Sequence, residues 1–115
     1  MIQALDSRLM NERVTPDGRY FVVRGRLWRR ANPNLPAERS EAIVRELMEA
    51  QRAVKLAEKS GRPEELVLAR KAVDAAKIAL GQRGPVWWED GAPDLNRHKV
   101  NDSPYAEWWA SRAHF

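Results

Sequence analysis

The segment from Gly84 to His98, GPVWWEDGAPDLNRH, holds more ionisable side chains than a simple connection requires. Carboxylates near a histidine can form an acid–base pair, and the candidate catalytic residues are therefore Asp90, Asp94 and His98. Two further polar residues of the segment are candidates for binding a ligand, Asn96 and Arg97. Asp and Asn beside Gly and Pro are also typical of ordinary turns, so a small active site and plain turn chemistry both stay open.

The same carboxylates could in principle hold a hard metal ion, because such ions prefer oxygen ligands. Their spacing matches no metal-binding motif, however, and we expect neither a metal nor a cofactor. The chain has no cysteine, which excludes disulfides, thiolate metal sites and cysteine nucleophiles. It also has no Gly-x-Ser-x-Gly motif and no glycine loop that precedes a helix and could hold a phosphate.

The chain has two pairs of adjacent tryptophans, Trp87–Trp88 within this segment and Trp108–Trp109 after it. Burial of an indole removes a large apolar area from water, so we expect one Trp of each pair to pack on the helices and the other to lie at a rim. If the loop is an active site, Trp87 and Trp88 would roof its pocket, and both are therefore candidate ligand-binding residues.

A second candidate site is basic. Residues 1–36 hold seven arginines against three acids, whereas residues 84–115 hold three bases against five acids, within a net charge of +4. The arginines cluster around a tryptophan, and the candidate binding residues there are Arg24, Arg26, Trp28, Arg29 and Arg30. Such a face attracts nucleic acid or another polyanion, with Trp28 available to stack on a base. It could equally meet the acidic tail of the same chain or of a second copy.

A β region must position these arginines. Pro16-Asp17-Gly18 is a turn signal, and residues 19–30 are rich in the aromatic and β-branched residues of a strand. In a single strand Leu27 would share a face with Phe21 and Val23, while Tyr20, Val22 and Trp28 would lie on the other. Gly25 is a point at which a bulge or bend would split the run into two strands.

A helical hairpin is predicted over residues 36–81. Pro36 and Pro63 suit first helical turns, while Gly61 and Gly81 suit the positions just after the helix ends. The apolar stripe expected on the first helix is Ile43, Val44, Leu47, Met48, Val54 and Leu56. On the second helix a heptad-like spacing is expected to face inward, with Leu66, Ala69, Val73, Ala76 and Leu80.

The predicted fold class is α+β in one domain of 115 residues. A strand region in 1–35 is followed by the hairpin of 36–81 and by a Trp-rich arm in 82–115. The arm is expected to be irregular and to end in a short helix from Pro104 to about Arg112, capped by Ser103. A short helix within residues 1–12 is a further prediction, since Ile2, Leu5 and Leu9 share one helical face.

Two helices cannot bury two apolar stripes by themselves, and the alanines of the second helix let another helix approach closely. We therefore expect either the C-terminal arm or a second copy, in a homodimer, to cover the hairpin. No apolar run approaches the ~18–20 residues of a membrane-spanning helix, so no membrane partner is expected. The start of the chain lacks a secretory signal, and we expect a cytoplasmic protein.

Three functions stay open on these observations. The first is a non-enzymatic binding module that self-associates and binds nucleic acid or another polyanion, and the second is a small enzyme that uses the loop. The third is a structural subunit of a larger complex.

The stretches DGRYFVVRGRLWRRANPNLP, GPVWWEDGAPDLNRH and SPYAEWW together resemble an uncharacterised family of small bacterial proteins. The resemblance covers most of the chain and implies a bacterial cytoplasmic origin. It brings no established activity, so it assigns no catalytic residue.

Overall fold

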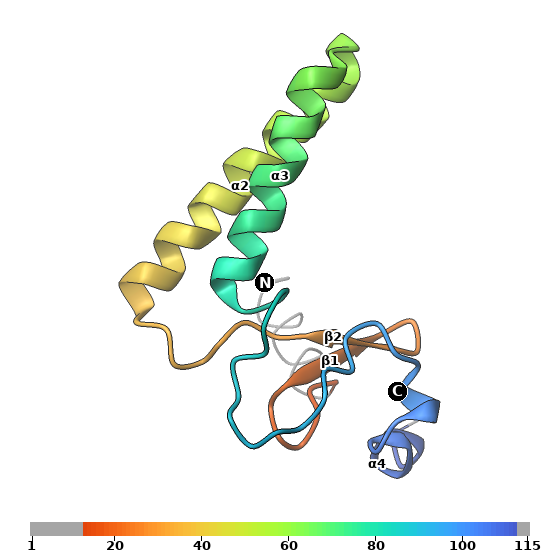
Figure 1. The fold of residues 1–115 in the computed structure, drawn as a ribbon. Coiled ribbons are helices and arrows are strands. Elements are labelled where there is room, and N and C mark those ends of the chain that lie inside the picture. The colour runs from red at the N-terminus through yellow and green to blue at the C-terminus, as the bar shows by residue number, and fades with distance from the viewer. Residues whose placement is uncertain (1–12, 113–115) are drawn as a thin grey trace, which may run out of the picture. The chain divides into compact units, whose positions relative to one another are not determined.

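The structure is a computed structural model, and it describes residues 13–112. The described elements are two strands, β1 (Tyr20–Val23) and β2 (Arg26–Arg29), the helices α2 (Ala37–Ser60), α3 (Pro63–Leu80) and α4 (Ala106–Ala110), and the 3₁₀ turn η1 (Val100–Asp102) (Figure 1). This order confirms the predicted α+β class. The helix predicted within residues 1–12 lies outside the described residues.

The chain divides into two compact units. The strand unit contains residues 13–30 and 90–112, and the helix unit contains residues 31–89. The three predicted segments were contiguous in sequence, whereas the strand unit joins both ends of the described chain. The reason is that the backbone of residues 93–100 bonds to the β-hairpin and not to the helices that precede it. The single domain stays a prediction.

In the strand unit, β1 and β2 form an antiparallel hairpin in which Tyr20 pairs with Arg29 and Val22 pairs with Leu27. Residues 24 and 25 make the two-residue turn, and both have positive φ, 52° and 78°, as the favoured hairpin turns require. The predicted split at Gly25 is therefore confirmed. The face assigned to Leu27 was wrong, because the turn resets the alternation and brings Leu27 beside Val22.

One face of this hairpin forms the core of the strand unit. Tyr20, Val22 and Leu27 are at most 1% exposed, and Val100 from the C-terminal arm is fully buried with them. The arm is held by its backbone: Leu27 N–H donates to the His98 carbonyl at 2.9 Å, and Val100 N–H donates to the Gly25 carbonyl at 2.9 Å. The hairpin therefore acquires a third, irregular segment beside β2.

In the helix unit, α2 and α3 run side by side as an antiparallel pair (Figure 1). Both helices end on a left-handed glycine, Gly61 with φ 64° and Gly81 with φ 88°, as predicted. The heptad spacing predicted for α3 is confirmed, because its buried residues are Ala69, Ala76 and Leu80.

The stripe predicted on α2 was partly wrong. The buried residues of α2 are Ile43, Ala50 and Ala57, with Leu47 and Val54 half-buried between them. The remaining predicted members are exposed, Val44 at 40%, Met48 at 51% and Leu56 at 67%. Ala50 and Ala57 are small, so α2 and α3 pack closely along a narrow contact that follows a heptad line. Larger side chains of α2 beside that line stay exposed to water.

The tryptophans divide between the units. Trp88 is 8% exposed in the helix unit, and a Cβ on Gly81, just after α3, would lie 3.0 Å from the Trp87 ring. The first pair therefore contains one buried and one half-buried indole next to the end of α3, as expected. The second pair departs from the expectation, because Trp108 and Trp109 lie in α4 of the strand unit and both are half-buried.

The C-terminal helix α4 begins at Ala106, two residues later than predicted. Ser103 explains the delay, because its hydroxyl donates to the Val100 carbonyl and accepts from the Tyr105 N–H, which closes a turn before the helix. None of the helices in residues 13–112 combines the length and the apolar character that a membrane crossing requires.

Candidate functional site

Three polar side chains of the 90–98 loop, those of Asp90, Asp94 and Asn96, are engaged in structural bonds. Asp90 pairs with Arg19 and accepts the Ala92 N–H at 3.0 Å. Asp94 accepts the Asn96 N–H at 3.0 Å, which closes a turn of the kind that short acidic side chains make. The Asn96 side chain in turn accepts the backbone N–H of Arg29 at 2.9 Å. These contacts hold the arm on the β-hairpin through Arg19 and Arg29.

Arg29 is the buried member of this network. Its side chain is 0% exposed and donates to Asp94 Oδ2 at 3.0 Å, while Asp94 stays 43% exposed. Arg29 lies on the core face because it pairs with Tyr20 across the hairpin. A guanidinium in that position cannot reach an external ligand, so Arg29 locks the arm to β2.

A second polar cluster joins the turn at Asp17 to the start of the C-terminal helix α4. Asp17 accepts hydrogen bonds from the hydroxyls of Tyr105, at 2.5 Å, and Thr15, at 2.7 Å. Partial burial raises the pKa of Asp17, but these hydrogen bonds and that from the Arg19 N–H outweigh burial and hold the pKa below its ordinary value. Burial, and then the neighbouring carboxylate, raise the pKa of Tyr105 well above its ordinary value. Asp17 is therefore an ionised structural acceptor, and Tyr105 a protonated donor.

The turn end of the hairpin is different in character. Here residues 97–100 run beside residues 25–27, with Arg26 and Lys99 opposite one another in an isolated β-bridge. The Arg26 guanidinium donates to the Arg97 carbonyl at 2.8 Å, and the Arg97 N–H donates to the Leu27 carbonyl at 2.6 Å. Side chains about seventy residues apart in sequence are thereby held at one end of the strand unit.

We call the exposed cations at this end the basic tip, namely Arg24, Arg26, Arg97 and Lys99. Within residues 13–112, none of the four forms an ion pair with a carboxylate, and Arg26 bonds only to a carbonyl. His98, also exposed, lies between two of them in sequence. Four positive charges are thus held together by backbone pairing, without acidic partners among residues 13–112 to neutralise them.

The backbone of the tip is unusual as well. In residues 13–112, two residues other than glycine have positive φ, and both belong to the tip: Arg24 at 52° and Arg97 at 72°. The left-handed region costs an arginine about 1–2 kcal/mol, whereas Asn or Gly adopts it readily. Strained residues of this kind cluster at functional sites, because selection retains the side chain in spite of its cost.

Arg97 also contacts Trp28. Its guanidinium carbon lies 5.9 Å from the centre of the half-buried Trp28 ring, within cation–π range. The Trp28 indole N–H is buried and finds no acceptor among the described residues. The Arg97 guanidinium and the Trp28 ring thus lie next to each other in the strand unit.

The predicted ligand-binding residues therefore separate into four groups. Arg24, Arg26, Trp28 and Arg97 come together at the tip, and Arg29 and Asn96 are used to hold the arm. Arg30 is exposed but donates to the Gly18 carbonyl at 3.2 Å, at the opposite end of the hairpin. The remaining two ligand-binding candidates, Trp87 and Trp88, contact each other edge to face in the helix unit. Sequence reasoning missed Lys99, although the basic run Arg97-His98-Lys99 was a signal for it.

The helix unit carries its own cations. A groove of about 700 Å³ runs along α2 and α3 and is lined in part by Lys55, Arg70 and Arg83. Arg70 lies 3.8 Å from Glu58, and Arg83 lies 3.0 Å from Asp74, so two of these three charges are locally compensated. The groove is a weaker anion site than the basic tip for that reason.

Among the described residues, no group of three or more His, Asp or Glu side chains is placed to hold a metal ion. Comparisons with protein-family models, with curated proteins and with solved structures found no match for this chain.

Proposed function

We propose that this protein is a non-enzymatic binding module that holds nucleic acid through the basic tip. The observation that carries the proposal is the set of four exposed cations, which have no acidic partner among residues 13–112 and include both strained arginines. Backbone phosphates are the natural complement of such a set, because each contact releases a condensed counterion.

The second support is the Arg97–Trp28 pair. A guanidinium 5.9 Å from the centre of an indole ring pairs a cation with an aromatic surface, and an unpaired base can stack beside the two. Double-stranded nucleic acid keeps its bases stacked on each other and offers mainly phosphates. We therefore expect single strands to bind more tightly than duplexes of the same length.

We do not favour the enzyme alternative, because the carboxylates and the amide of the loop serve turns and ion pairs. We do not propose catalysis by Asp90, Asp94 or His98.

The test is a binding titration of fluorescently labelled single- and double-stranded oligonucleotides over a salt series. The log of the binding constant should fall linearly with the log of the salt concentration, as counterion release requires. Absence of binding at low salt, or binding that salt does not change, would overturn the proposal.

The variant R24N sharpens this test, because Asn adopts positive φ more readily than Arg. R24N should leave the fold intact or slightly more stable, while it weakens oligonucleotide binding. In the pair R24N/R97N, we expect at least a tenfold loss of affinity and a salt slope lower by about 1.4 for single strands, near 0.7 per phosphate contact. The matched control is R45N/R52N, which removes the same charge from exposed positions of α2 and should change neither quantity by as much.

We also propose that the protein self-associates as a homodimer through its helix unit. In residues 13–112, the large hydrophobic side chains that are clearly exposed all belong to α2 and α3: Val44, Met48, Leu56, Val67, Leu68 and Ile78. Large apolar side chains exposed on the two helices of one unit favour a protein–protein contact at that unit. Measurement of mass by light scattering over a range of concentrations tests this proposal, and a monomer at all concentrations would refute it.

A further inference from the structure

We infer, on the basis of the proposed function, that Asn96 is a positioning residue for nucleic-acid binding. Asn96 acts without touching the ligand, because it fixes the backbone from which the Arg97 side chain reaches Trp28. Such a residue must offer a hydrogen-bond acceptor at the edge of β2, and the side-chain amide of Asn96 supplies one.

The arm is attached along the outer edge of β2. Leu27 uses both of its backbone groups there, since its N–H donates to the His98 carbonyl at 2.9 Å and its carbonyl accepts the Arg97 N–H at 2.6 Å. Two residues further along β2, the Arg29 N–H points to the same edge, because a strand repeats every second residue. At this position a side chain takes the place of the arm backbone, and Asn96 Oδ1 accepts the Arg29 N–H at 2.9 Å. The attachment of the arm to β2 therefore ends on the Asn96 amide.

Asn96 is held from two directions, and both lead to Arg29. Its side chain accepts the Arg29 N–H, and its own N–H donates to Asp94 Oδ1 at 3.0 Å. The other carboxylate oxygen of Asp94 accepts from the Arg29 guanidinium at 3.0 Å, and that guanidinium is buried. The backbone just before Arg97 is thereby tied to the core of the strand unit.

The conformation of Arg97 requires this support. Its φ of 72° lies in the left-handed region, which arginine rarely adopts. Such a conformation persists only where the surrounding bonds over-determine it. The bonds in question are those of Arg97 to Leu27 and from Arg26, together with the bond of the preceding Asn96. Without the Asn96 bond, we expect residue 97 to relax toward negative φ.

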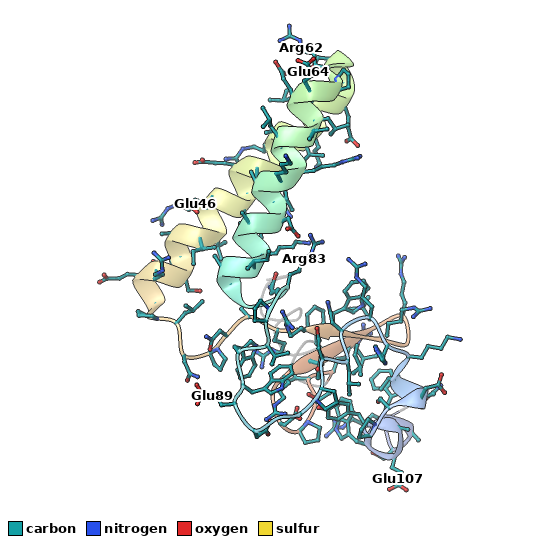
Figure 2. The ribbon with its side chains drawn as sticks, in the orientation of Figure 1. Glu46, Arg62, Glu64, Arg83, Glu89 and Glu107 are labelled. Atoms are coloured by element: carbon teal, nitrogen blue, oxygen red, sulfur yellow. The ribbon has the colours of Figure 1, made fainter. Side chains whose placement is uncertain are left out.

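The contact of Arg97 with Trp28 depends on that backbone. Trp28 alternates along β2 with the buried Leu27 and Arg29, so its ring lies on the opposite face of the hairpin. The arm runs beside the hairpin, and side chains of both lie close together in the strand unit (Figure 2). The Arg97 guanidinium starts from the arm and lies 5.9 Å from the centre of the Trp28 ring. A change in the φ of Arg97 redirects this side chain, so it moves one charge of the tip away from the ring.

Asn96 can be tested separately from the charges of the tip because it is neutral. N96A removes the acceptor and leaves every charge of the protein in place. One hydrogen bond between neutral groups is a small part of the stability of a domain, so N96A should stay folded. The matched control is N32A in the helix unit, where Asn32 Oδ1 also accepts one backbone N–H, that of Asn34, at 2.9 Å.

The decisive measurement is a double-mutant cycle on the affinity for a labelled single-stranded oligonucleotide. With Arg97 present, N96A should weaken binding about threefold or more, as expected for two residues of one network. In the R97N background the same change should alter the affinity by less than about 1.5-fold, because no guanidinium is left to position. N32A should alter the affinity by less than about 1.5-fold in both backgrounds. A merely structural role of Asn96 would weaken binding equally in both backgrounds, and that result would overturn the inference.

A second readout does not depend on binding. Protons near an aromatic ring have displaced NMR resonances, so those of the Arg97 side chain should differ from the ordinary positions for arginine. N96A should return them toward the ordinary positions. N96D keeps an oxygen that can accept the Arg29 N–H, so it should leave these resonances near those of the parent. Unchanged resonances in N96A, or equal changes in N96A and N96D, would contradict the role of Asn96.

Failure of this inference and failure of the proposed function give different results. If the parent binds no oligonucleotide, the proposed function fails, and the role of Asn96 in binding fails with it. If the parent binds and N96A has the same effect with Arg or Asn at position 97, Asn96 is not a positioning residue, whereas binding by the tip stands.

Discussion

The ion pair between Arg29 and Asp94 gives the sharpest prediction for stability. D94N removes the carboxylate charge but keeps an oxygen that can accept the Asn96 N–H, so the turn is preserved. The N···O distance of 3.0 Å corresponds to about 5.5 kcal/mol of Coulomb energy at an effective dielectric constant of about 20. Because Asp94 is 43% exposed, solvent screens part of this energy, and we expect D94N to lower the free energy of unfolding by about 2–3 kcal/mol.

The chain provides a control with the same geometry and a different environment. Arg62 and Glu65 also lie 3.0 Å apart, but their side chains are 67% and 55% exposed. E65Q should therefore cost less than about 1 kcal/mol, as surface pairs do. Urea unfolding, followed by circular dichroism and by tryptophan fluorescence, measures both variants under the same conditions.

A double-mutant cycle decides whether the charge pair is the cause. In the background R29M, where no buried guanidinium needs a partner, D94N should cost less than about 0.5 kcal/mol. If D94N lowers the free energy of unfolding no more than E65Q does, or lowers it equally with Met and with Arg at position 29, then the buried Arg29 charge is not the cause of the loss.

Three further predictions concern the helices and the pH dependence. G81A should destabilise the protein more than G61A, by about 1 kcal/mol or more. Both positions have positive φ, but a Cβ at Gly81 would also meet an indole carbon at 3.0 Å. Equal losses of unfolding free energy in urea would contradict this contact. I43A should cost about 2–4 kcal/mol, since Ile43 is 3% exposed, whereas M48A, at 51% exposure, should cost less than about 1 kcal/mol. Because folding lowers the pKa of Asp17, the stability that Asp17 contributes is present above its unfolded pKa near 4 and is lost as the pH falls through its folded pKa. The midpoint of thermal unfolding should therefore change less for D17N than for the parent between pH 6 and pH 3. Parallel curves of this midpoint against pH would refute the prediction.

The helices could be predicted because their signals are local. The heptad line from Leu66 to Leu80 and the glycines after each helix define α3 without reference to any other part of the chain. The error on α2 has a tertiary cause. Val44, Leu47 and Met48 are all hydrophobic and lie close together, and only the close approach of α3 over Ala50 and Ala57 decides that Leu47 is half-buried while the other two are exposed.

The basic tip could be predicted only in part. The sequence indicated an arginine-rich strand region around Trp28, and it also indicated Arg97 as a binding residue. It could not indicate that Arg97 lies over Trp28, because that contact depends on backbone bonds between segments about seventy residues apart.

Composition and periodicity by themselves determined a cysteine-free α+β chain with two capped helices and an excess of arginine near its start. Only the tertiary structure decided the fate of each arginine. Arg26 and Arg29 are three residues apart on one strand and chemically identical, yet one is exposed and the other is 0% exposed beside Asp94. The physical reason is that a strand alternates its faces, while the segment that covers one of those faces comes from the far end of the chain.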